Sequence, residues 1–217
     1  MSELNSLSDL NDLCPLCSHK GDLFYLDHFY LCPECKGIFR SPQYHLSHDQ
    51  EKSHYQCHNN DVTDLGYQKF ATPLAKHILN HCKSTDLGLD FGAGAAPILS
   101  KLLQDQNYTV KQYDPYFHHH PDLLDLNYDY IGSCEVIEHF NHPAQEFQLL
   151  HRLLKVGGSL FCMTHLYNCN IDFKNWYYKN DTTHVFIYQK ETCEWIAQHF
   201  GFVTTIMSER IVRFEKV

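Results

Sequence analysis

The feature that most constrains the fold of this chain is a short apolar segment that ends in two closely spaced glycines. Leu87–Phe91 has the length and composition of a buried strand, and Gly92-Ala93-Gly94 follows it directly. Glycines let the backbone approach a ligand closely and take dihedral angles that other residues resist. A turn of this kind after a parallel strand predicts a binding site at the carboxyl end of a sheet.

Apolar strands and helical patterns alternate around this turn. The expected strands are Leu87–Phe91, Thr109–Tyr113, Tyr130–Val136, Ser159–Thr164, Phe202–Met207 and Arg210–Phe214. A first helix is expected from about Val62, and further helices over Pro97–Gln106, Pro143–Lys155 and Glu191–Phe200. This alternation predicts an α/β fold, in which a mostly parallel sheet carries helices on both faces. The last two strands predict a terminal hairpin.

Two aspartates end the first two strands of this pattern. Asp90 lies where a carboxylate can reach the ammonium group of a ligand, directly or through water. Asp114 follows the next strand and can accept hydrogen bonds from both ribose hydroxyls of a nucleoside. Pro97 stands where the full dinucleotide fingerprint has its third Gly. We therefore expect a nucleoside without a phosphate, and a tight turn with no ligand is the alternative.

At these residues the chain resembles class I S-adenosylmethionine-dependent methyltransferases. The matching segments are Leu87–Gly94, Tyr113–Pro115, Asp129–His139 and Leu154–Leu160. The resemblance implies an α/β, Rossmann-like sheet of seven mostly parallel strands with a reversed C-terminal hairpin. It also implies S-adenosylmethionine as methyl donor, and the residues implied to bind it are Asp90, Phe91, Gly92, Ala93, Gly94, Asp114, Pro115, Cys134 and Glu135. The family usually has a third Gly where this chain has Ala96, which concerns local geometry alone.

Glu135, Glu138 and His139 form the pattern E-x-x-E-H after the third strand. One helical turn would bring these positions onto one face, where they can bind a divalent cation or hold a base. The pattern resembles ubiquinone-pathway O-methyltransferases and small-RNA 2′-O-methyltransferases, and by this resemblance Glu135, Glu138, His139 and His184 are ligands of a second divalent cation. The alternative is a metal-free base among Glu135, His139 and His184. In a purely structural interpretation, Glu135 lines the donor pocket and Glu138 forms a cap or salt bridge.

Four cysteines near the N-terminus form two C-x-x-C pairs. Cys14, Cys17, Cys32 and Cys35 have the spacing of a tetrahedral four-thiolate site, for which zinc is expected and iron is the alternative. A module of this size has little core, so the metal would hold it together. We therefore expect a zinc-ribbon head and connector over residues 1–54 and a methyltransferase domain over residues 55–217. The segment Cys32–Tyr55 also resembles the zinc-binding head of some bacterial methyltransferases, which include enzymes that act on sugars, and other zinc-headed members act on ribosomal RNA.

Residues that face the acceptor are expected next to the first core helix and after the strand Ser159–Thr164. The candidates are Tyr55, His58, Asn59 and Trp176. Their amide, hydroxyl and aromatic groups suit a polar or planar acceptor, although Asn59 can equally belong to a turn and Tyr55 and Trp176 to the core.

The charge balance disfavours a nucleic-acid partner. The formal net charge is -9 with His neutral, and a negative surface repels phosphates. No apolar run is long enough to span a membrane, and the polar N-terminus lacks the features of a secretory signal, so we expect a cytoplasmic protein with reduced cysteines. The leading hypothesis is a methyltransferase acting on a small-molecule acceptor, at oxygen. The alternatives are an RNA methyltransferase that uses the zinc head to hold RNA, and a non-catalytic zinc-ribbon adaptor.

Overall fold

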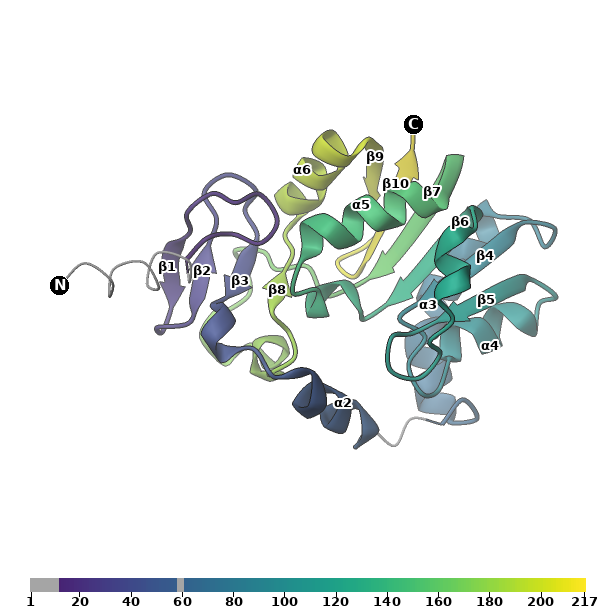
Figure 1. The fold of residues 1–217 in the computed structure, drawn as a ribbon, viewed down its shortest axis with the longest axis horizontal. Helices are drawn as coiled ribbons and strands as arrows, with labels where there is room; N and C mark the ends of the chain where they lie inside the picture. The colour runs from purple at the N-terminus through teal and green to yellow at the C-terminus, as the bar shows by residue number, and fades with distance from the viewer. Residues whose placement is uncertain (1–11, 58–60) are drawn as a thin grey trace.

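A computed structural model of the chain describes residues 12–57 and 61–217 (Figure 1). Its main sheet has six strands, in the order β5-β4-β6-β7-β10-β9. They are β4 (Leu87–Phe91), β5 (Thr109–Tyr113), β6 (Tyr128–Cys134), β7 (Leu154–Met163), β9 (Phe202–Ile206) and β10 (Ile211–Lys216). Strands β5, β4, β6 and β7 pair in parallel, whereas β10 pairs antiparallel with both β7 and β9. The expected α/β sheet with a reversed C-terminal hairpin is confirmed.

The expected number of strands was wrong by one, since the described sheet has six strands rather than seven. The missing strand would lie beyond β5, between Tyr113 and Tyr128. This segment instead makes one isolated bridge between Asp114 and His118 and a short 3-10 helix, η2 (Pro121–Asp125). A parallel crossover alone needs at least about a dozen residues, so the segment is too short to add both a helix and a strand.

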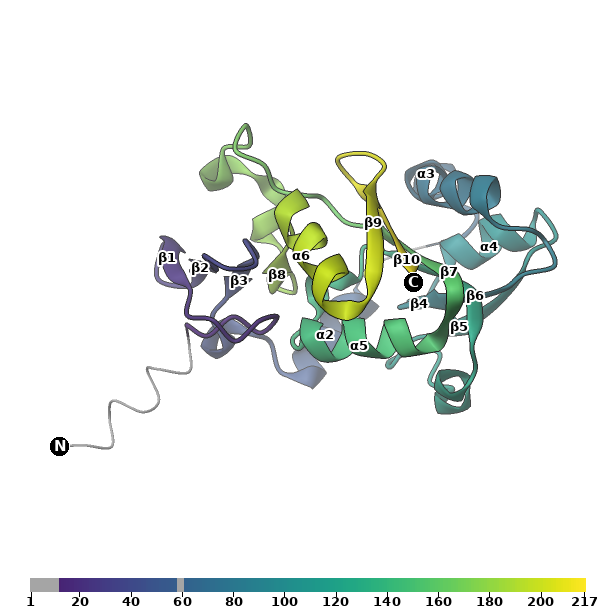
Figure 2. The ribbon, with the colours of Figure 1, turned by 90° about the horizontal axis from the view of Figure 1, so that it is seen from above.

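Helices cover both faces of the sheet (Figure 2). They are α3 (Leu65–His81), α4 (Ile98–Gln104), α5 (Pro143–Leu153) and α6 (Lys190–Phe200). Helices α3 and α4 pack on one face, in a cluster that includes Phe161 of β7. Helices α5 and α6 pack on the other face, in a cluster that includes the neighbouring Leu160. Adjacent residues of β7 thus supply the two cores, because side chains alternate across a strand.

The cysteine head forms a second sheet that includes a strand from the C-terminal part of the chain. Its own strands are β1 (Asp22–Tyr25), β2 (Phe29–Leu31) and β3 (Ile38–Arg40). The fourth strand, β8 (Phe186–Ile187), pairs antiparallel with β3, with Ile38 opposite Ile187 and Phe39 opposite Phe186. Figure 1 shows β8 running between the head and the main sheet.

The segment expected to be a plain connector contains helical structure. A 3-10 turn, η1 (Pro42–Tyr44), is followed by α2 (His48–Gln56). Helix α2 begins at a capping box, in which the Ser47 side chain accepts from the Gln50 amide and the Gln50 side chain accepts from the Ser47 amide. The expected domain boundary after residue 54 therefore falls inside α2. Among the described helices, none has the length and apolar character to cross a membrane.

Candidate active site

The glycine turn after β4 is shaped by both of its glycines. Gly92 and Gly94 have φ angles of 80° and 63°, in the left-handed region that favours glycine. The amides of Gly92 and Ala93 donate to the Tyr113 carbonyl at 2.8 and 3.1 Å, which ties the turn to β5. A Cβ atom on Gly92 would lie 2.5 Å from the Val136 side chain, whereas one on Gly94 would meet nothing within 4 Å. Gly92 is therefore needed for packing as well as conformation.

Asp114 is held in place by three backbone amides. Its Oδ2 accepts from the Gly94 amide at 2.9 Å, and its Oδ1 accepts from the amides of Tyr116 and Phe117 at 2.8 and 3.0 Å. The residue is largely buried and lines a cavity next to the glycine turn. Because a carboxylate oxygen can accept two hydrogen bonds, Oδ2 retains capacity for a ligand hydroxyl.

Asp90 is not among the described residues that line this cavity, and its expected contact with a donor ammonium group, directly or through water, stays a prediction. Its Oδ2 accepts from the amide and the hydroxyl of Ser100, at 3.0 and 2.7 Å, near the start of α4. Successive side chains of a strand point to opposite faces, and α4 covers the face on which Asp90 lies. Burial raises the pKa of Asp90 to about 6. Asp90 therefore anchors the start of α4, which follows the glycine turn.

One cavity of about 990 Å³ extends from the glycine turn to His139 and His184. The expected donor-binding residues that line it are Phe91, Gly92, Ala93, Gly94, Asp114, Pro115, Cys134 and Glu135. Burial raises the pKa of Cys134 well above its usual value, so this thiol stays protonated and is no nucleophile. A cavity of this volume is within the range of small-molecule binding sites.

The E-x-x-E-H segment does not form the α-helical turn expected of it. Glu135 has a φ of 52°, and its amide donates to the Met163 carbonyl at 2.8 Å. A short 3-10 helix, η3 (Ile137–His139), follows. The left-handed residue turns the Glu135 carboxylate toward Arg210, whose Nη1 lies 3.3 Å away. Burial raises the pKa of Glu135, and Arg210 opposes that shift.

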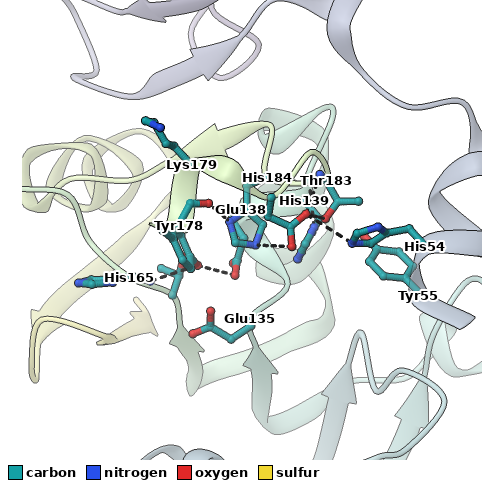
Figure 3. A network of polar contacts seen from close by, with 12 residues as sticks. His54, Tyr55, Glu135, Glu138, His139, His165, Tyr178, Lys179, Thr183 and His184 are labelled. Carbon is teal, nitrogen blue, oxygen red and sulfur yellow. Dashed lines mark hydrogen bonds and ion pairs between the residues drawn. The ribbon is translucent and has the colours of Figure 1, made fainter. Parts of the chain in front are cut away.

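Three of the four expected metal ligands lie together. Potential ligand atoms of Glu138, His139 and His184 are all within 4.8 Å of one another, and Glu135 is outside this group. Nδ1 of His139 lies 3.0 Å from the Thr183 carbonyl, and Nδ1 of His184 lies 2.7 Å from the Tyr178 carbonyl. Since a carbonyl only accepts, both rings donate from Nδ1, and each Nε2 keeps a lone pair. Figure 3 shows the side chains of Glu138, His139 and His184 close together.

The protonation of this cluster is governed by burial. Burial lowers the pKa of His139 to about 3 and also lowers that of His184, so both rings are neutral near pH 7. Burial raises the pKa of Glu138 well above its usual value. The Tyr178 hydroxyl donates to Glu138 Oε1 at 2.5 Å, while the buried Oε2 has no hydrogen-bond partner among the described residues.

The donor set of this cluster fits a divalent cation. Two neutral imidazoles, each held through Nδ1, and a carboxyl oxygen without a partner can bind a cation once the Glu138 carboxyl loses its proton to metal binding. The same two Nε2 lone pairs can equally accept a proton from a substrate hydroxyl. The cluster can therefore serve as a base or as a metal site, because a lone pair that binds a cation cannot also accept a proton.

The expected acceptor residues separate into two groups. Tyr55, from α2, lines the cavity with its ring centroid 5.6 Å from that of His139. Trp176 does not line the cavity, because it is 6% exposed in an aromatic cluster with Phe173 and Tyr178. Its place is taken by the next residue, Tyr177, at the start of η5 (Tyr177–Asn180). The predictions for His58 and Asn59 fall outside the described residues.

Several residues of the cavity were not expected from the sequence. They include Glu51, Asp181 and Arg210. Arg210 follows β9 in the turn of the C-terminal hairpin, and its Nη2 donates to the Tyr177 hydroxyl and lies 3.2 Å from Nδ1 of His165. Arg210 reaches Glu135 at the end of β6 because the hairpin pairs with β7, and no local sequence pattern predicts this contact.

The four head cysteines lie at distances that suit a single metal ion. The Sγ atoms of Cys14 and Cys35 are 3.5 Å apart, those of Cys17 and Cys32 are 3.3 Å apart, and all four lie within 4.8 Å of one another. The residue after each pair, Ser18 or Lys36, has a left-handed φ and donates its amide back to the first cysteine of that pair. Zn–S bonds of ~2.3 Å place sulfurs ~3.8 Å apart in a tetrahedron, so the four residues fit zinc.

Comparisons with known proteins agree with this architecture. A family model described as "Methyltransferase domain" matches residues 66–205. Among solved structures, CalO1, a methyltransferase in calicheamicin biosynthesis in its SAH-bound form, is similar with a TM-score of 0.52 and 10% identity over 69% of this chain and 54% of that chain. Human N-acetylserotonin methyltransferase in complex with SAM is similar with a TM-score of 0.52 and 12% identity over 78% of this chain and 56% of that chain.

An O-methyltransferase family protein from Burkholderia thailandensis has a TM-score of 0.50 and 12% identity, over 69% of this chain and 56% of that chain. The chain thus spans just over half the length of these three structures. At this level of identity the similarity concerns the fold. A search of curated protein sequences finds no significant match.

Proposed function

Because the chain belongs to the methyltransferase domain family, we propose that it transfers the methyl group of S-adenosylmethionine to an oxygen of a small-molecule acceptor. The observation that carries this proposal is the single cavity that joins the glycine turn and Asp114 to the neutral imidazoles of His139 and His184. A nucleoside donor at one end and a proton acceptor at the other are what O-methylation requires.

The donor end supports a nucleoside by shape and by hydrogen bonding. Asp114, fixed by three amides, accepts from a ribose hydroxyl through the remaining lone pair of Oδ2. Gly94 borders the cavity without a side chain, which leaves room for the methionine part of the donor. Holding donor and acceptor in line provides most of the expected rate, because methyl transfer needs close approach more than acid–base help.

At the acceptor end, a hydroxyl oxygen attacks the methyl carbon while the carbon–sulfur bond breaks. The electron pair of that bond stays on sulfur, which yields S-adenosylhomocysteine. The hydroxyl proton passes to Nε2 of His139 or His184, which is free because each Nδ1 donates to a backbone carbonyl. Tyr55 and Tyr177 provide aromatic walls for the acceptor.

Two metal sites belong to this proposal. Cys14, Cys17, Cys32 and Cys35 hold a structural zinc ion, since their four sulfurs suit its geometry. The second site is the alternative to the imidazole base: Glu138, His139 and His184 would hold a divalent cation through their free ligand atoms, and that cation would lower the pKa of an acceptor hydroxyl.

The donor is tested by calorimetry with S-adenosylhomocysteine. We expect micromolar binding by the zinc-loaded protein and a loss of at least about tenfold in affinity for Asp114→Asn, since hydrogen bonds to a charged acceptor contribute about 1.5–3 kcal/mol. Asp125→Asn is the matched control, because Asp125 is an exposed acid of the same segment, and it should bind normally. Absence of heat with the unmodified protein would refute the proposal.

The acceptor class is tested with donor labelled in its methyl group. The protein is incubated with a metabolite extract and, separately, with total RNA. We expect label in acid-soluble products, and loss of that label in His139→Gln and His184→Gln variants that still bind S-adenosylhomocysteine. Label in acid-precipitated RNA instead would favour the RNA methyltransferase and contradict a small-molecule acceptor.

A further inference from the structure

Arg40 joins the cysteine head to the loop that carries His184. It is the last residue of β3 and is only 8% exposed. Its Nη2 donates to the carbonyls of Lys179 and Asp181 at 3.0 and 3.1 Å, and its backbone amide donates to the Val185 carbonyl at 2.8 Å. One head residue thus binds the loop 179–185 at both of its ends.

This loop sets the orientation of the cluster at the acceptor end. The Thr183 carbonyl accepts from His139, and the Tyr178 carbonyl, directly before the loop, accepts from His184. The Val185 amide donates to the Glu138 carbonyl at 2.9 Å. Figure 3 shows Lys179 and Thr183 on either side of the two imidazoles. Displacement of the loop would therefore turn both rings and change which nitrogen carries the proton.

Arg40 is itself positioned by the metal-binding part of the head. Its guanidinium carbon lies 4.9 Å from the centre of the Phe29 ring in β2, and β2 leads directly into Cys32. The second cysteine pair is also tied to α6, because Nε2 of Gln189 donates to the Lys36 carbonyl at 2.6 Å. The head thus contacts the chain both before β8, through Arg40, and after β8, through Lys36.

We propose that the cysteine head positions the acceptor end of the active site, and that Arg40 is the positioning residue which transmits this support to His139 and His184. Arg40 contacts the loop backbone and takes no part in the chemistry. The role of Arg40 in methyl transfer rests on the proposed function, whereas its support of the loop 179–185 and the two imidazoles does not depend on that function.

The test compares Arg40→Ala and Arg40→Lys with Lys20→Ala in zinc-loaded, full-length protein. Lys20 is the matched control, because it is a head cation that pairs with Asp12 at the surface. Three quantities are measured. They are amide hydrogen exchange by segment, the tautomers of His139 and His184 from the nitrogen-15 chemical shifts of their imidazole rings, and binding of S-adenosylhomocysteine by calorimetry.

For Arg40→Ala we expect amide exchange in residues 179–187 to accelerate by at least ~10-fold, while exchange in β4 and β6 stays unchanged. Both histidines should shift from the Nδ1-protonated tautomer toward a mixture. Binding of S-adenosylhomocysteine should stay within about twofold, since Arg40 does not line the donor end. Arg40→Lys keeps a buried cation and can donate to one carbonyl, so it should give an intermediate result, and it serves as the test if alanine prevents folding.

Unchanged histidine tautomers in a folded Arg40 variant would overturn the inference, as would faster exchange spread evenly over the whole chain. Uniformly faster amide exchange would mean that Arg40 stabilises the fold without positioning the loop. Failure of the unmodified protein to bind S-adenosylhomocysteine would count against the proposed function alone, because the exchange and tautomer measurements do not need a donor.

Discussion

Asp90 is a buried carboxylate, and its protonation should affect the stability of the whole protein. Its folded-state pKa is about 6, above the ordinary value of 3.8, so the folded protein binds this proton more tightly than the unfolded chain does. The resulting stability is fully present below about pH 3.8 and is lost as the pH rises through 6. Between pH 7 and pH 5, the unfolding free energy of the unmodified protein should rise by about 1 kcal/mol relative to Asp90→Asn.

Urea denaturation of both proteins at the two pH values measures this difference. Asparagine is the matched replacement, because its side-chain oxygen can still accept from the amide and hydroxyl of Ser100. A difference between the two proteins that does not change with pH would show that Asp90 has an ordinary pKa.

Single residues could be predicted from the sequence where the requirement is local. Gly92 and Gly94 were predicted because a left-handed turn after a strand needs glycine, and the structure gives both a positive φ. Asp114 was placed beside that turn because parallel strands end at one edge of the sheet. The contacts of Asp90 with Ser100 and of Glu135 with Arg210 were not predicted, because they depend on the position of α4 and on one left-handed residue, which spacing alone does not reveal.

At the scale of elements, α2 is held against the cavity by polar contacts. None of its residues is fully buried, and Glu51 accepts through Oε1 from the Tyr55 hydroxyl and through Oε2 from the Tyr116 hydroxyl, at 2.7 and 2.9 Å. Tyr116 belongs to the loop that fixes Asp114. Glu51 therefore links the helix that covers the cavity to the residue proposed to hold the ribose.

Replacement of Glu51 by alanine should loosen α2 and weaken donor binding together. We expect faster amide exchange in α2 and a loss of roughly 5–10-fold in affinity for S-adenosylhomocysteine, which corresponds to about 1 kcal/mol for two exchanged hydrogen bonds. Asp49→Ala is the control, because it removes a fully exposed acid from the same helix. If Asp49→Ala reduced the affinity as much as Glu51→Ala, helix charge rather than the tyrosine contacts would be responsible.

The elements missed by the sequence are those that lack a periodic apolar pattern. Helix α2 has no buried face, so its only sequence signal is the capping box at Ser47 and Gln50. Strand β8 has two residues, too few for any alternation. In contrast, α3, α5 and each strand of the main sheet have an apolar side, and these were predicted with errors of a few residues at their ends.

At the scale of the whole molecule, the head and the domain share one core. The cluster on the α5 face contains Cys14, Leu16 and Phe39 from the head together with Phe147 of α5 and Tyr188 beyond β8. Two units with a common core unfold together. We therefore expect a single calorimetric transition for the zinc-loaded protein, although composition suggested two separate domains.

Removal of zinc by a chelator should lower the unfolding temperature of the entire protein. Structural zinc contributes about 10–16 kcal/mol of apparent binding energy in isolated fingers, and the shared core spreads its loss to the domain. Differential scanning calorimetry before and after chelation, with zinc added back as control, measures this effect. Two transitions, of which only the smaller responds to chelation, would indicate an independently folded head.

The pairing of Ile38 with Ile187 also has a consequence for synthesis on the ribosome. The head strands leave the ribosome early, whereas their fourth strand emerges only after nearly the whole domain has been made. At ~5–20 residues per second, β3 waits about 10–30 s with an open edge. An open edge is a template for pairing with another chain, so a nascent-chain chaperone or early zinc capture would matter most during this interval.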